Sequence, residues 1–117
     1  MPDADAVIHA GAAARWPTLE LVDQLANVGS EVERAIRAHG AGNPTRWEHA
    51  QARALELFDL TATDPRWRGA RRREILRARE EFCRVFHSSD ATPASAEGLR
   101  RYFLAFAVAA RRRVGAG

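Results

Sequence analysis

Residues 18–39, TLELVDQLANVGSEVERAIRAH, decide the fold that we expect for this 117-residue chain. An apolar or small residue recurs every three or four positions, at Val22, Leu25, Gly29, Val32 and Ile36. That spacing lines up one apolar stripe along an α-helix. The later segments repeat this helical period, and no stretch shows the sustained alternation of a β-strand. We therefore predict an all-α fold.

Proline marks where the later helices begin. Asn43–Pro44, Asp64–Pro65 and Thr92–Pro93 each pair a helix-capping residue with proline at the first helical position. The predicted elements are a flexible N-terminal tail over residues 1–17, helices over about residues 18–39, 44–62, 65–87 and 93–112, and a C-terminal tail over 114–117. Because the connections are short, neighbouring helices should be antiparallel. The prediction is a single domain, an up-down antiparallel four-helix bundle over residues 18–113.

Composition and motifs narrow the class of protein. The only cysteine, Cys83, cannot form a disulfide within the chain, and the longest apolar run, residues 102–110, is far shorter than the roughly 20 residues of a membrane-spanning helix. The N-terminus lacks the pattern of a signal peptide, so we expect a soluble, cytoplasmic protein that does not bind membranes. The four histidines are widely spaced, and the chain has no phosphate-binding glycine loop or serine-nucleophile motif. We predict no metal and no cofactor.

The charges are unevenly distributed along the chain. All 18 basic residues are arginine; residues 1–65 hold 5 of them against 10 acidic residues, and residues 66–117 hold 13 against 5. This asymmetry favours an anionic partner. Two alternatives stay open: the acidic half neutralises the basic half within one molecule, or it faces the basic surface of a second subunit.

Arginine is densest near the predicted start of the third helix. Over residues 66–73 arginines surround the helix axis, so this part cannot pack inside a bundle. Either it projects beyond the bundle, or the chain around Gly69 is a loop; both expose arginine around Trp67, a combination that suits phosphate contact and base stacking. An up-down bundle would bring a second cluster, at the end of the fourth helix, to the same pole. The candidate nucleic-acid-binding residues are Arg66, Trp67, Arg68, Arg71, Arg72, Arg73, Arg111, Arg112 and Arg113.

The predicted fourth helix is apolar on every face. Leu104 and Val108 lie opposite its main apolar side, with Phe103 between the two sides. A helix buried on two sides needs a second partner, so we predict a homo-oligomer with Phe103, Leu104 and Val108 in its interface. The alternative is that the N-terminal tail folds over this face and covers it with Trp16.

One hexapeptide resembles a catalytic motif. Residues 34–39, RAIRAH, have the R-x4-H spacing of HEPN ribonucleases, which are small helical bundles that cut RNA at a dimer interface. The size and helical plan of the chain are also similar to HEPN proteins and to related small bacterial four-helix bundles. The resemblance implies that His39 would act as the acid/base and that Arg34 would steady the phosphate.

Three functions follow from these patterns. The leading one is a non-enzymatic binding or assembly module whose arginine pole binds RNA, DNA or another anionic partner. The second is a HEPN-like ribonuclease toxin of a toxin–antitoxin pair. The third is a structural role, in which opposite charges hold subunits together or bind a protein partner encoded nearby.

Overall fold

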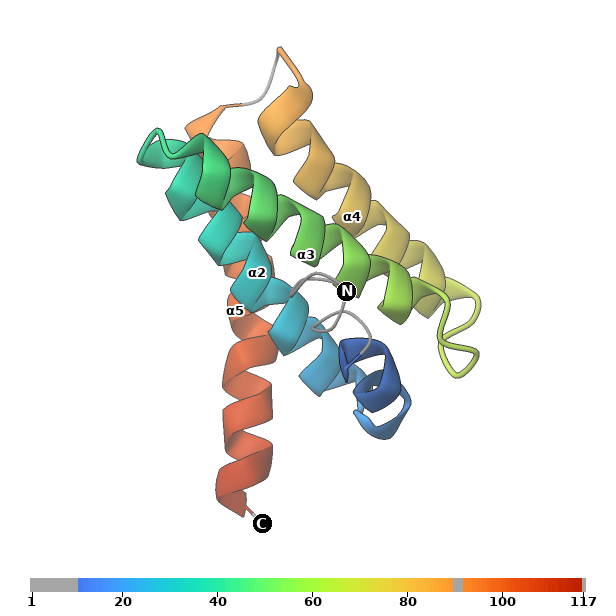
Figure 1. The fold of residues 1–117 in the computed structure, drawn as a ribbon. Helices are drawn as coiled ribbons and strands as arrows, with labels where there is room; N and C mark the ends of the chain where they lie inside the picture. Colours follow the sequence, from blue (N-terminus) through green and yellow to red (C-terminus); the bar gives the residue numbers. More distant parts are fainter. Residues whose placement is uncertain (1–10, 90–91, 117) are drawn as a thin grey trace, which may run out of the picture.

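The computed structural model describes residues 11–89 and 92–116, and within them it is all-helical with no β-strand. The elements are a 3-10 helix η1 (Trp16–Thr18) and four long helices, α2 (Leu21–Gly40), α3 (Pro44–Ala62), α4 (Ala70–His87) and α5 (Pro93–Ala116) (Figure 1). The predicted all-α class is confirmed.

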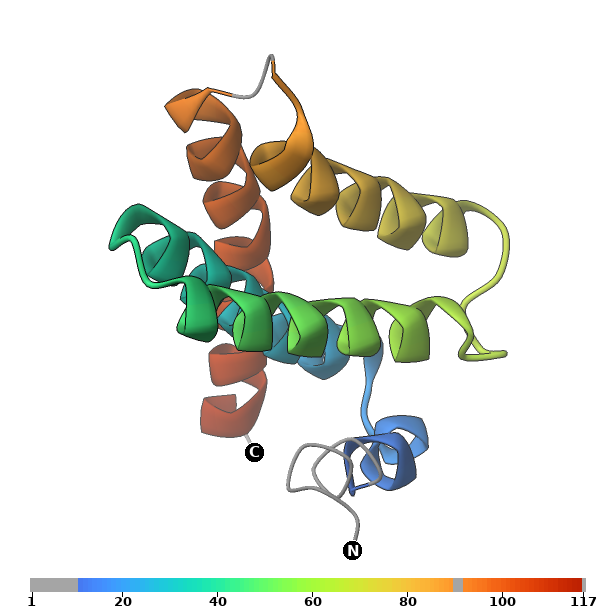
Figure 2. The same cartoon turned by 45° about the horizontal axis from the view of Figure 1, so that its top comes forward.

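The helices are arranged around α2. It forms a hairpin with α3 and packs on another side against α5, while α4 contacts α3 and α5 less extensively. Consecutive long helices run in alternating directions, but α5 is steeply inclined to α3 and α4 (Figures 1 and 2). The C-terminal half of α5 extends past the other helices in Figure 1.

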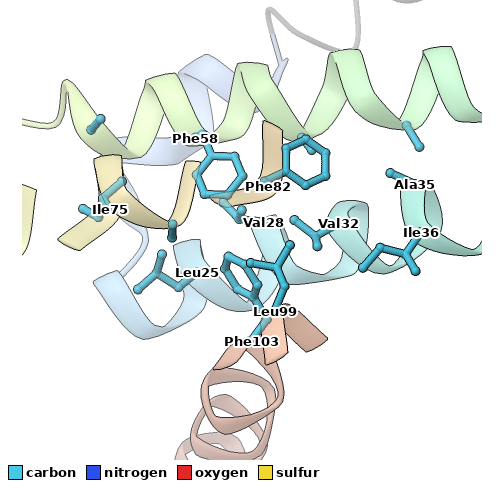
Figure 3. Packing of buried hydrophobic residues seen from close by; sticks show 14 of the residues in the cluster. Leu25, Val28, Val32, Ala35, Ile36, Phe58, Ile75, Phe82, Leu99 and Phe103 are labelled. Atoms are coloured by element: carbon cyan, nitrogen blue, oxygen red, sulfur yellow. The ribbon is translucent and has the colours of Figure 1, made fainter. Parts of the chain in front are cut away.

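Aromatic side chains fill the centre of the core. Phe58 of α3 and Phe82 of α4 are fully buried, with ring centroids 5.7 Å apart, and Phe103 of α5 lies 5.9 Å from Phe58 (Figure 3). The approach of α5 to α2 requires a residue without a side chain at Gly29, because a Cβ atom there would lie 2.8 Å from the Cβ of Phe103. The apolar stripe of α2 therefore packs against α3 and α5, and the rings of Phe58 and Phe82 join α3 to α4.

The helix starts agree with the proline signals at two positions of three. The Asn43 side chain accepts a hydrogen bond from the backbone N–H of Arg46, and α3 and α5 begin at the predicted prolines. The third prediction is wrong, because α4 begins at Ala70 instead of residue 65. Residues 64–69 form a loop that ends at Gly69, whose positive φ of 65° favours glycine. This is the second of the two arrangements considered for residues 66–73.

The N-terminal prediction also needs correction. Residues 11–15 are helical, and Trp16 is a core residue with only 4 % of its surface exposed. Its indole Nε1 donates a hydrogen bond to Thr61 Oγ1 at 2.9 Å, so it packs against the end of α3. Trp16 therefore does not cover Leu104, which is 60 % exposed. The first ten residues of the predicted tail lie outside the described residues.

Candidate nucleic-acid interface

The arginine-rich loop is fixed to the start of α2 by one buried side chain. Gln24 is completely buried; its Nε2 donates hydrogen bonds to Asp64 Oδ2 at 3.0 Å and to the carbonyl oxygen of Trp16 at 2.9 Å. Its Oε1 accepts a hydrogen bond from Trp67 Nε1 at 2.7 Å. A single glutamine thus joins η1, α2 and the loop before α4. Buried polar groups need such partners, so the network fixes the path of the loop.

Trp67 is buried, which corrects the expectation that it would stack on nucleic-acid bases. Only 7 % of its surface is exposed, and it belongs to the hydrophobic core. Guanidinium groups cover what remains of the indole: the Cζ atoms of Arg66 and Arg71 lie 4.5 Å and 5.8 Å from the ring centroid. In this conformation a base has no access to the ring, so Trp67 has a structural role.

Arg66 also has an internal role. Its Nη2 lies 2.8 Å from Asp64 Oδ2 and donates a hydrogen bond to the carbonyl oxygen of Leu19 at 2.7 Å. The Asp64 carboxylate accepts a further bond from the backbone N–H of Arg66 at 3.0 Å. Hydrogen bonding from the Arg66 side chain, supported by Gln24, lowers the pKa of Asp64 far below its ordinary value although burial opposes this shift.

The remaining arginines of the loop and of the first turn of α4 divide into two groups. Arg72 is half-buried and donates from Nη2 to the Asp64 carbonyl oxygen at 3.2 Å, so it faces inward. Arg68, Arg71 and Arg73 are exposed and form no ion pair with any described residue. Of these three, Arg68 donates a hydrogen bond to the backbone oxygen of Pro65 at 3.1 Å. Four of the six predicted binding residues in this region are therefore exposed, and three of them have no ion-pair partner because Arg66 pairs with Asp64.

The second arginine cluster contacts the same helix end. Arg113 of α5 forms an ion pair with Asp23, which precedes Gln24 in the first turn of α2. Arg111 and Arg112 are exposed and have no ion-pair partner among the described residues. The first turn of α2 thus touches both clusters. We use "basic pole" for the five exposed, unpaired residues Arg68, Arg71, Arg73, Arg111 and Arg112.

Part of the basic surplus is neutralised inside the molecule. Four ion pairs within the described residues join the basic half to the acidic half: Arg66 with Asp64, Arg79 with Asp59, Arg100 with Glu33, and Arg113 with Asp23. The Arg100 Nε lies 2.8 Å from Glu33 Oε2, and the Arg79 Nε lies 3.0 Å from Asp59 Oδ1. These contacts agree with the expectation that one half neutralises the other, so only the arginines outside such pairs contribute unmatched charge.

The two residues of the R-x4-H match have different surroundings. Arg34 is exposed, and its Nη1 lies 2.6 Å from Glu31 Oε1. The His39 ring packs against the aromatic rings of Trp47 and Phe86, with centroid distances of 5.7 Å and 5.1 Å. In this arrangement His39 forms part of an aromatic cluster, and no described contact joins it to Arg34.

The predicted oligomer interface is partly internal. Phe103 is 4 % exposed and packs against Phe58 and α2, which corrects its assignment to an intermolecular surface. Leu104 and Val108 are 60 % and 36 % exposed on the outer side of α5. These two residues remain candidates for contact with a partner.

Other kinds of site lack support in the described part of the chain. His, Cys, Asp and Glu side chains form no group there that could hold a metal ion, and the lone Cys83 is half-buried. None of the described helices combines the length and hydrophobicity that crossing a membrane requires.

Comparison with protein-family models, with curated proteins and with solved structures found no match to this chain.

Proposed function

We propose that this protein is a non-enzymatic helical module that binds RNA or DNA through its basic pole. The supporting observation is that five exposed arginines without carboxylate partners lie on two segments that both contact the first turn of α2. The helix directions alternate along the chain in Figure 1, as in an up-down bundle, but the inclined end of α5 diverges from the start of α4, so the contacts with α2 are what relate the two segments.

The chemistry of the pole suits phosphate groups. Arginine presents several donors in a planar fork that matches a phosphate group, and an unpaired arginine loses no internal ion pair when it binds. The buried bonds of Gln24 hold the loop that carries Arg68 and leads into the first turn of α4, where Arg71 lies, so less conformational freedom is lost on binding. Because Trp67 is buried, the pole offers phosphate contacts without base stacking. Binding should therefore be independent of sequence and sensitive to salt.

The test is a titration of a fluorescently labelled single-stranded oligonucleotide at low salt, followed by anisotropy. Replacing both Arg71 and Arg73 with alanine should weaken binding by about tenfold or more, since each loses a charged contact to phosphate. The matched control is Arg77→Ala with Arg101→Ala, which removes the same charge from two exposed side chains outside the basic pole. Absence of binding by the native protein, or equal weakening by both double variants, would reject the proposal.

A second candidate function is self-assembly through α5. Its support is the exposure of Leu104 and Val108 on a helix whose C-terminal half extends past the other helices in Figure 1. Sedimentation equilibrium should show an oligomer that dissociates in Leu104→Ser and persists in Val114→Ser, a change at a residue that is 77 % exposed elsewhere on α5. A native protein that stays monomeric at every concentration would exclude this function.

A further inference from the structure

The hairpin of α2 and α3 carries a second basic surface, away from the basic pole. A groove of about 500 Å³ lies between the end of α2 and the start of α3, and its basic lining residues are Arg34, Arg37, Arg46, His49 and Arg53. The connection between these helices lies at the other end of α2 from the loop that Gln24 fixes (Figure 1). This groove was not among the sites that the sequence indicates.

Positive charge in the groove is not balanced by acidic residues. No carboxylate lines it, and Arg46 and Arg53 form no ion pair with any described residue. Arg34 and Arg37 pair with glutamates outside the lining, but their side chains are 63 % and 76 % exposed. Exposed ion pairs contribute little, so these two guanidinium groups can turn toward a bound anion.

The charge distinguishes this groove from a larger one. The groove between α4 and α5, about 790 Å³, is lined by Arg73 and Arg77 together with Glu74 and Glu81. The charges of the two arginines and the two glutamates cancel in that groove, so its lining does not select a ligand by net charge. The α2–α3 groove has four arginines and no carboxylate, which specifies a polyanion.

The spacing of the basic side chains indicates more than one phosphate group. Arg46, His49 and Arg53 recur at intervals of three and four residues, which puts them along one face of α3. Arg46 and Arg53 are separated by a rise of about 10 Å along the helix axis. The lining also includes the small residues Ala38, Ala41 and Ala50, of which Ala38 and Ala50 leave room between the two helices.

No Phe, Tyr or Trp side chain lines the groove, and the imidazole of His49 is the one ring in its lining. The nearby Trp47 packs instead against His39 and Phe86, at centroid distances of 5.7 Å in both cases. The groove therefore offers a nucleobase little aromatic surface, whereas its four guanidinium groups match phosphate oxygens.

We propose that this groove binds a small polyanion with two or three linked phosphate groups, the chemistry shared by inorganic polyphosphates and the phosphate chain of nucleotides. Arg46 and Arg53 supply the unpaired charge, and Arg34 and Arg37 close on the ligand from α2. The proposal is independent of the nucleic-acid function, because it uses residues at a different end of the hairpin.

Isothermal titration calorimetry with inorganic tripolyphosphate at low salt tests the proposal on the full chain. The native protein should bind, and Arg46→Ala with Arg53→Gln should weaken binding at least tenfold, because two charged contacts are lost. Glutamine at position 53 keeps part of the stem of that half-buried side chain, and circular dichroism confirms that the variant is folded. The control is Arg77→Ala with Arg101→Ala, which removes the same charge from two exposed side chains outside the groove and outside the basic pole, and it should bind tripolyphosphate as the native protein does.

Three results would overturn the proposal. The first is no detectable binding of tripolyphosphate, including the case in which an oligonucleotide alone binds. The second is equal weakening in the two double variants, which would indicate general charge attraction. The third is a nucleoside triphosphate that binds more than tenfold tighter than tripolyphosphate, because that would require contacts to the base. Loss of oligonucleotide binding in the Arg71/Arg73 variant, with tripolyphosphate binding intact, separates this site from the basic pole.

Discussion

Replacing Gln24 with methionine tests whether one buried side chain fixes the arginine-rich loop. Methionine has a similar length and helix propensity, so α2 should form as before. It cannot replace the bonds to Asp64, Trp16 and Trp67, which the native glutamine makes at 2.7–3.0 Å. The variant therefore removes the polar contacts while nearly keeping the volume.

The expected loss follows from what each partner retains. Trp67 Nε1 keeps no acceptor in its buried position, which costs about 1–3 kcal/mol. Asp64 keeps its ion pair with Arg66 and loses one hydrogen bond to a charged group, about 1.5–3 kcal/mol. We expect the free energy of unfolding to fall by about 2.5–6 kcal/mol in total, a large part of the 5–15 kcal/mol typical of a domain.

Urea denaturation followed by far-ultraviolet circular dichroism measures this loss. The control is Gln51→Met: the Gln51 side chain makes an exposed hydrogen bond with His87 at 2.9 Å, and its loss should cost less than about 1 kcal/mol. In a Trp67→Phe background the indole N–H is absent, so Gln24→Met should cost about 1–2 kcal/mol less than in the native protein. The reasoning is refuted if Gln24→Met costs no more than Gln51→Met, or costs the same in both backgrounds.

Three further predictions concern packing and titration. Gly29→Ala should destabilise the protein by about 1–3 kcal/mol because its Cβ would lie 2.8 Å from the Phe103 Cβ. Gly98→Ala, whose Cβ would have no atom within 4 Å, should stabilise the protein by up to about 1 kcal/mol, and equal melting temperatures of the two variants would contradict this. Because the pKa of Asp64 is lowered in the folded protein, its carboxylate stabilises the fold above the ordinary pKa of 3.8, and this stabilisation is lost as the pH falls below that value. Asp64→Asn should therefore flatten the acid side of a plot of unfolding free energy against pH, and an unchanged acid side would count against the ion pair with Arg66. Burial and the hydrogen bond to Glu74 raise the pKa of Tyr102, the only tyrosine, so the protein should lose stability as the pH rises above 10. Ultraviolet absorbance should show phenolate formation well above that pH, and an ordinary titration midpoint in the folded protein would show that the bond is absent.

Local signals in the sequence were sufficient for most of the helix ends. Asn43–Pro44 predicts the start of α3 because both capping groups act within one turn, and the side chain of Asn43 does accept the expected bond. Asp64–Pro65 has the same pattern, but the Asp64 carboxylate bonds to the N–H of Arg66 and to distant Gln24. Those contacts favour a loop, and α4 begins only after Gly69.

The burial of the tryptophans could not be predicted locally. Trp67 stands among arginines in the sequence, which is typical of an exposed segment, and its acceptor is on Gln24, 43 positions away. Trp16 lies in an alanine-rich stretch with weak periodicity, and its hydrogen-bond partner Thr61 is 45 positions away. Such contacts depend on how the helices pack, so propensity and periodicity cannot indicate them. The α2–α3 groove was missed for the same reason, because its arginines come from two helices.

The salt dependence of oligonucleotide binding tests the central claim, that unpaired arginines of the basic pole contact phosphate groups. The logarithm of the association constant should fall linearly with the logarithm of the salt concentration, and the slope should decrease in magnitude by about 1.4 for single-stranded DNA when Arg71 and Arg73 are both alanine. The change follows from two lost phosphate contacts, each worth about 0.7 in the slope. A slope that is the same in the native protein and in this variant would contradict the account.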